Sequence, residues 1–128
     1  MERETFERVW QRVQGRAGML ERQLAEEAES VAFYRWLMER CPSCRRETAA
    51  LRREAEASLR ALREEYFLRG GESWEPPLEQ RRPPMVISAL RQQYRQEQER
   101  AAGSTGALRV SREKRAAILR GLLLRLIN

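Results

Sequence analysis

Histidine is absent from this chain of 128 residues. Histidine is the commonest general base, the commonest metal ligand and the usual partner of a serine or cysteine nucleophile, so its absence excludes the arrangements that depend on an imidazole. Cysteine occurs only twice. No stretch approaches the roughly 20 consecutive apolar residues of a membrane-spanning helix, and no run has the alternation of a half-buried strand. These absences predict a helical protein that has no membrane partner.

Charge is plentiful but mixed in sign. The chain has 25 basic and 19 acidic residues, a net charge of +6, and Lys114 is its only lysine. Arginine and glutamate are interleaved, as in "LRREAEASLRALREE". Such mixing supports helices through i,i+3 and i,i+4 pairs and does not build a one-sided track for phosphates, so nucleic acid is an unfavoured partner. The charged N-terminus, "MERETFERVWQRV", lacks the apolar core of a signal peptide, which predicts a cytoplasmic protein.

Nearly the whole chain has the periodicity of helices, and its length predicts a single domain over 1–128. Glycines and prolines divide the chain into a short first helix and two hairpins, over 19–70 and 85–127, of which the second is shortened. The expected elements are helices over 3–14, 19–40, 45–68, 85–102 and 108–127, a turn at 41–44, a Pro-rich crossover at 71–84 and a loop at 103–106. This order predicts an all-α four-helix bundle, with a short extra N-terminal helix that Gly15 and Gly18 end.

A glutamate lies within the apolar face of the helix expected over 19–40. Glu27 belongs to a row of residues spaced by 3 and 4 positions, which traces one face of a helix. The other members of the row are Leu20, Leu24, Val31, Tyr34 and Met38. A carboxylate in such a row is costly to bury unless a cation pairs with it, a proton neutralises it or a metal binds it.

The other helices have comparable rows. In the helix over 85–102, Glu97 occupies the row that Ile87, Leu90, Tyr94 and Ala101 define. The row of the helix over 45–68 holds Leu51, Ala55, Ser58 and Leu62. In the helix over 108–127 the row is ambiguous, and Glu113 and Ala116 can lie on its inner face.

The pattern resembles the ferritin-like superfamily, specifically the rubrerythrin-like proteins. The resemblance covers roughly residues 5–128 and rests on four stretches: Glu27 followed seven positions later by Tyr34, "LRREAEASLRALREEYFLRGGESWEP", "LRQQYRQEQERAA" and "SREKRAAILRGLL". Bundles of this kind bind metal through one glutamate from each of two helices and a Glu-x-x-His pair from each of the other two. The resemblance implies a ferritin-like bundle whose remaining metal ligands are Glu27, Glu97 and Glu113.

The chain departs from the family's ligand pattern. Ala55 and Ser58 stand where the second helix should supply its glutamate and histidine, and Ala116 stands at the histidine position after Glu113. Ser104 takes the place of the tyrosine that would pair with Glu97. Three carboxylates are fewer than the about four to six protein ligands of a di-iron site. The favoured interpretation is a degenerate site whose inward glutamates pair with arginines or water, and the alternatives are di-iron catalysis and one hard cation such as Mg²⁺, Ca²⁺ or Mn²⁺.

The turn "CPSC" places Cys41 and Cys44 in a C-x-x-C spacing. Three interpretations stay open: incidental reduced cysteines, a disulfide or redox pair, and a zinc site in which the hairpin tips of two chains supply four thiolates, as in a zinc hook.

The sequence therefore predicts a helical bundle that has lost di-iron catalysis and acts as a structural or partner-binding protein, with another protein or a second copy as partner. Its expected contact surface is the aromatic and proline-rich crossover. The alternatives are a rubrerythrin-like oxidoreductase that uses the residual carboxylates and an Arg-rich nucleic-acid-binding module. No cofactor is expected, with iron and zinc as the alternatives.

Overall fold

The computed structural model describes residues 2–75 and 85–127, and the side chains of 18–75 and 85–127. It contains four α-helices, α1 (Glu2–Arg40), α2 (Arg45–Gly70), α3 (Val86–Ala102) and α4 (Gly106–Ile127), and no strand within these ranges. The predicted all-α four-helix bundle is thus confirmed. None of the described helices combines the length and apolarity that crossing a membrane requires.

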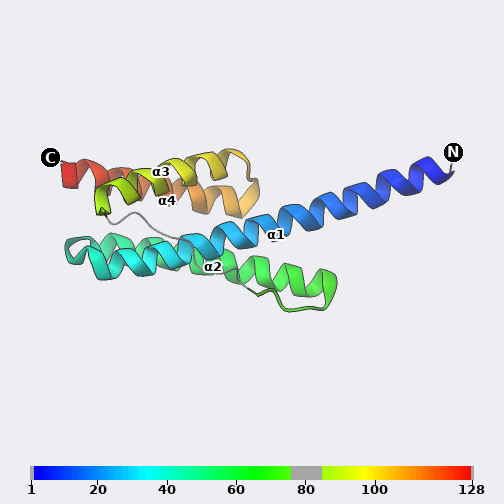
Figure 1. The fold of residues 1–128 in the computed structure, drawn as a ribbon, viewed down its shortest axis with the longest axis horizontal. Coiled ribbons are helices and arrows are strands. Elements are labelled where there is room, and N and C mark those ends of the chain that lie inside the picture. The colour runs from blue at the N-terminus through cyan, green and yellow to red at the C-terminus, as the bar shows by residue number, and fades with distance from the viewer. Residues whose placement is uncertain (1, 76–84, 128) are drawn as a thin grey trace.

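The helices form two hairpins that lie side by side (Figure 1). A short 3-10 helix, η1 (Pro42–Cys44), connects α1 to α2, and a tight loop connects α3 to α4. Most contacts are made within a hairpin, while α2 with α4 and α1 with α3 join the hairpins. Gly71 ends α2 in the left-handed conformation, with φ of 70°, and its N–H donates to the Phe67 carbonyl. Of the expected crossover, 76–84 lies outside the described residues.

The first helix is longer than the sequence suggested. It continues through Gly15 and Gly18, so the short helix expected over 3–14 is the first part of α1. A glycine inside a helix costs only about 1 kcal/mol relative to alanine, and it ends a helix only where the following residues turn the chain. The N-terminal part of α1 projects beyond the other helices (Figure 1).

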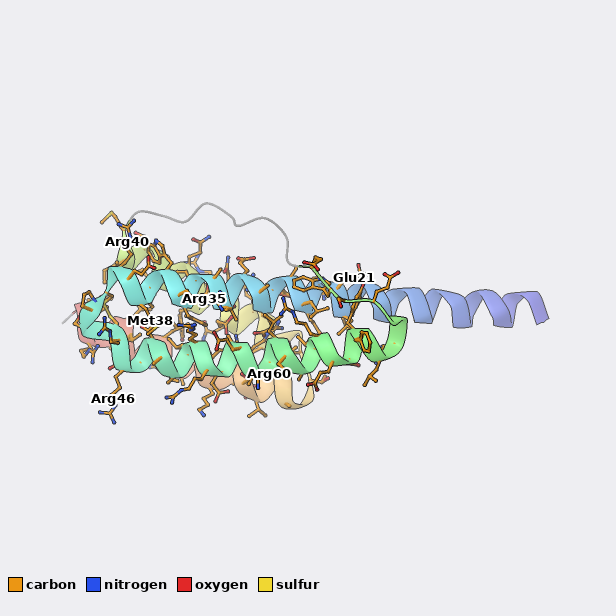
Figure 2. All side chains as sticks on the ribbon, turned by 90° about the horizontal axis from the view of Figure 1, so that it is seen from below. Glu21, Arg35, Met38, Arg40, Arg46 and Arg60 are labelled. Carbon is orange, nitrogen blue, oxygen red and sulfur yellow. A yellow bond between two sulfur atoms is a disulfide. The ribbon has the colours of Figure 1, made fainter. Side chains whose placement is uncertain are left out.

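Charged side chains cover the outside of the hairpins. Figure 2 shows Arg35, Arg46 and Arg60 on the outer surface of α1 and α2. Several arginines of this surface pair with glutamates on the same helix, for example Arg52 with Glu56 at 2.8 Å. This is the i,i+4 pairing that the mixed charge pattern predicted.

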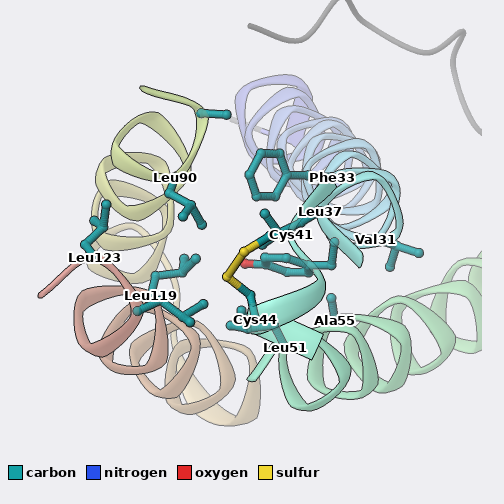
Figure 3. Packing of buried hydrophobic residues seen from close by; sticks show 13 residues of the cluster. Val31, Phe33, Leu37, Cys41, Cys44, Leu51, Ala55, Leu90, Leu119 and Leu123 are labelled. Atoms are coloured by element: carbon teal, nitrogen blue, oxygen red, sulfur yellow. A yellow bond between two sulfur atoms is a disulfide. The ribbon is translucent and has the colours of Figure 1, made fainter. Parts of the chain in front are cut away.

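The buried apolar rows agree with the sequence rows apart from shifts on α1 and on α3, where Gln93 is buried and Tyr94 is half-buried. Leu24, Tyr34 and Leu90 are fully buried, but Met38 is only half-buried and Leu37 is buried beside it. The larger core cluster is shown in Figure 3, where its side chains converge from all four helices on the space between the hairpins. A smaller cluster joins Leu20, Leu24 and Leu62 near the end of α2.

Candidate functional site

Glu27 lies in the bundle interior, as its row predicted, and two arginines of α4 hold it. The residue is 0% exposed. Arg115 approaches as a fork, with Nη1 2.8 Å from Oε2 and Nη2 2.7 Å from Oε1. Arg112 donates from Nε to Oε1 at 2.9 Å. Both carboxylate oxygens are therefore taken up by charge-assisted hydrogen bonds.

Glu97, on α3, is the second buried carboxylate and is less completely paired. Its Oε1 accepts from Ser30 Oγ at 2.9 Å. Arg115 Nε lies 3.1 Å from Oε2, but its N–H is directed at the Ser111 carbonyl, 3.4 Å away, so this oxygen accepts no hydrogen bond from the described residues. The charge of Arg115 is thus close to both glutamates, while its hydrogen bonds favour Glu27.

Burial and the neighbouring charges shift the proton affinities in the interior. Burial raises the pKa of the Glu97 carboxyl, the charge of Arg115 lowers it, and the Glu27 charge raises it. Burial opposes the charge on Arg115, but hydrogen bonding to Glu27 and the charge of Glu97 keep its pKa above the usual value. Burial, followed by the Glu97 charge, raises the pKa of the Tyr34 phenol.

Arg112 links the interior to the loop between α3 and α4. Its Nη1 donates to Ser104 Oγ at 2.6 Å and to the Arg100 carbonyl at 3.2 Å. Ser104 thus orients the Arg112 guanidinium. Arg112 therefore fixes the start of α4 against the end of α3.

The charges of the cluster balance. Glu27 and Glu97 supply two negative charges, and Arg112 and Arg115, which are 2% and 0% exposed, supply two positive ones. An isolated buried charge would be far more costly than this neutral group, because the interior screens poorly and offers no water. We call these four residues the buried charge cluster.

Glu113 does not belong to the cluster, so its predicted inward position is wrong. Its side chain is 55% exposed, and it accepts a hydrogen bond from Arg109 at 2.8 Å. The inner face of α4 is instead formed by Arg112, Arg115, Ala116 and Leu119, which recur at helical spacing. The neighbouring position 113 is turned by about 100° from 112 and leaves this face.

The buried charge cluster does not fit a metal centre. Among the residues whose side chains are described, no three histidine, cysteine or acidic residues are grouped as metal ligands. Both oxygens of Glu27 already accept from guanidinium groups. At the second-helix positions, Ala55 is buried without a donor atom and Ser58 bonds to Ser111 at 3.2 Å. A di-iron site needs more donors, held free for the ions.

Cys41 and Cys44 are joined by a disulfide across three positions of the turn. In this oxidised form they carry no thiolate, so they cannot act as zinc ligands until they are reduced.

Sequence reasoning did not single out Arg112 and Arg115. The signal was their place in the row that continues through Ala116 and Leu119. Arginine at such a position is normally assigned to the surface, because it is almost never fully buried without a partner. Burial of Arg112 and Arg115 is expected only because Glu27 and Glu97 face inward and can pair with them.

Comparison of the chain with protein-family models, with curated proteins and with solved structures finds no match in any of the three.

Replacing Arg115 with methionine should destabilise the fold strongly. The change leaves Glu27 and Glu97 buried beside a single remaining arginine, and loss of one partner from a buried ion pair costs about 3–5 kcal/mol. Urea unfolding followed by circular dichroism measures the effect. Arg109→Met, which removes an exposed pair on the same helix, should cost less than about 1 kcal/mol. Equal losses in the two variants would contradict the role of the cluster.

The stability contributed by Glu97 should fall as pH rises. The pKa of Glu97 is raised in the folded protein, so the folded state holds the proton more tightly than the unfolded state does. The resulting stabilisation is fully present below the unfolded pKa of about 4.3 and is lost as pH rises through the folded pKa. The wild-type protein should therefore lose stability relative to Glu97→Gln between acidic and neutral pH.

Glu54→Gln is the control of opposite sign. Hydrogen bonding from Lys114 lowers the pKa of Glu54, so its contribution is present above the unfolded pKa and is lost as pH falls. Urea unfolding at several pH values compares the two variants with the wild-type protein. A wild-type advantage over Glu97→Gln that stays constant or grows with pH would contradict the prediction.

Proposed function

We propose that this chain is a ferritin-like bundle of the rubrerythrin-like kind in which arginines have taken over the metal centre, and that it works as a structural, partner-binding protein rather than an oxidoreductase. The observation that carries the proposal is the Arg115 fork on Glu27, at 2.7 and 2.8 Å. The resemblance of the sequence places Glu27 and Glu97 at ligand positions, and both are buried.

A guanidinium can replace the charge of a metal but not its chemistry. Arg112 and Arg115 compensate the buried carboxylates and fix their orientation. They offer no open coordination position and no accessible change of oxidation state, which metal-dependent oxidation requires. A metal would also have to displace both arginines and leave their charges buried without partners, which is strongly unfavourable. The cluster therefore supports a structural role.

Protein purified without a histidine tag or chelator should contain no stoichiometric iron or manganese. Added Fe²⁺ or Mn²⁺ should leave the melting temperature unchanged, because the Glu27 oxygens are occupied by guanidinium groups. Elemental analysis and thermal unfolding test this. Stoichiometric metal that is lost in Glu27→Gln but kept in Glu113→Gln would overturn the proposal and restore the oxidoreductase alternative.

The contact surface that we propose lies at the end of α2 and continues into the residues after it. A groove of about 780 Å³ there is lined by Arg60, Arg63, Glu64, Phe67, Leu68, Ser73, Trp74 and Glu75. We call it the α2-end groove. Among the aromatic residues, Trp36, Tyr66 and Trp74 pack against the core clusters, whereas Phe67 is 54% exposed. Leu68 beside it is 82% exposed. Two neighbouring exposed apolar side chains favour association.

We propose that a second copy of the chain occupies this groove. A two-fold interface brings the same patch together with itself, so the patch must be self-complementary. The α2-end groove meets this condition, since its apolar centre is bordered by arginines at 60 and 63 and by glutamates at 64 and 75. The opposite charges of one copy can then face those of the other.

Sedimentation equilibrium over a range of protein concentrations tests the dimer. The wild-type chain should pass from monomer to dimer, and Phe67→Ser/Leu68→Ser should remain monomeric because it loses the apolar centre. Val110→Ser/Leu124→Ser removes two exposed apolar side chains from α4 and should dimerise as the wild type does. A wild-type protein that stays monomeric, or equal loss in both variants, would exclude this interface.

A further inference from the structure

The disulfide at the tip of the first hairpin has the arrangement of an exchange site. Cys41 and Cys44 are the only cysteines of the chain, so the bond between them accounts for all of its thiol chemistry. Cys41 precedes η1, and Cys44 is the N-cap of α2. The pair lies beside Leu37 and Leu51 in the close view of the core (Figure 3).

The two sulfurs differ in access. Cys44 is 0% exposed, whereas Cys41 is 8% exposed. Both residues are buried, and Cys41 is the more exposed of the two, which makes it the better target for an incoming thiolate. Attack at that sulfur makes Cys44 the leaving group. Because Cys44 caps α2 and no side chain occupies this cap, the N–H groups of the first helical turn can stabilise the negative charge that develops on its sulfur.

The surface around the turn is strongly basic. Arg40, Arg45 and Arg46 are exposed, and Figure 2 shows Arg40 and Arg46 at this end of the hairpin. Arg125 reaches the turn from α4, where it donates to the Ser43 carbonyl at 3.0 Å and pairs with Glu47. Glu39 is the other acidic residue beside the turn in the sequence. Four arginines against two glutamates leave an excess of positive charge, which attracts anionic reactants.

We propose that Cys41 and Cys44 form a thiol–disulfide exchange site for a small anionic thiol, the class of carboxylate-bearing peptide thiols to which glutathione belongs. This activity is independent of the buried charge cluster and of the scaffold role. Cys41 receives the thiol, Cys44 leaves and resolves, and the arginines around the turn select for negative charge.

The reaction balances without any further reagent. A thiolate attacks Cys41 Sγ, a new S–S bond forms to it, and the Cys41–Cys44 bond breaks with its electron pair on Cys44, which then takes a proton from water. A second thiolate attacks the sulfur of the bound thiol, so that a disulfide leaves and Cys41 is released and protonated. Two thiols are oxidised to one disulfide, and the protein gains two electrons and two protons. The reverse sequence reoxidises the pair.

Two single-cysteine variants identify the exchanging sulfur. Folded Cys44→Ser, treated with glutathione disulfide, should trap one glutathione on Cys41, seen by intact mass spectrometry. Cys41→Ser should remain unmodified for the same time, because Cys44 is fully buried. Circular dichroism confirms that both variants fold. Equal labelling of the two variants, or none until the protein is unfolded in urea, would overturn the proposal.

Selection for charge is tested on the wild-type disulfide. The rates of opening by reduced glutathione and by neutral 2-mercaptoethanol are compared at equal thiolate concentration, on this disulfide and on a neutral model disulfide. The ratio of the glutathione rate to the 2-mercaptoethanol rate should be about tenfold higher for the protein than for the model disulfide. Arg40→Gln/Arg46→Gln should remove most of this preference. Arg53→Gln/Arg95→Gln, which makes the same charge change at exposed arginines of α2 and α3, should keep it. An equal preference in both variants would exclude the basic surface as the selecting element. Exchange itself would be excluded if the reduced protein binds zinc between two chains and does not react with glutathione disulfide.

Discussion

The pairing of Arg115 with Glu27 is the interaction on which the rest of this structure depends. Its atoms come from α1 and α4, that is, from different hairpins, and the same guanidinium lies 3.1 Å from Glu97 on α3. Most other contacts are made within a hairpin. Loss of either arginine would leave a buried carboxylate without its partner. The cluster therefore requires the two hairpins to dock in one register.

The buried charge cluster affects which packing the two hairpins adopt more than how stable that packing is. Replacing a buried ion pair by apolar residues is often neutral or stabilising, whereas removing one partner is costly. The cluster thus penalises packings that separate the arginines of α4 from the glutamates, and in the observed packing both oxygens of Glu27 accept from these arginines. In the ferritin-like interpretation that we propose, the guanidinium groups take the place of metal ions and supply the positive charge that inward carboxylates require. The fold that we propose for this chain can keep its interior carboxylates without keeping a metal.

The helices and the two inward glutamates were predictable, but the partners of those glutamates were not. Rows spaced by 3 and 4 residues correctly placed Glu27 and Glu97 inside, because each helix has a clear apolar face around them. The fourth helix has arginine at inward and outward positions alike, so Glu113 was misplaced. The break expected at Gly15 and Gly18 is not found because single glycines only weaken a helix.

The sequence by itself determined what is local. It determined that the chain forms helices, where α2 ends, that the first hairpin turns at Cys41 and Cys44, and that two carboxylates face inward, because these properties follow from residue spacing and turn chemistry. Tertiary structure alone decided which arginines are buried and that one of them serves two glutamates. Arg109, Arg112 and Arg115 have the same chemistry and similar neighbours in sequence. Only the docking of α4 against α1 and α3 distinguishes them, since it places the second and third beside buried carboxylates and leaves the first in solvent.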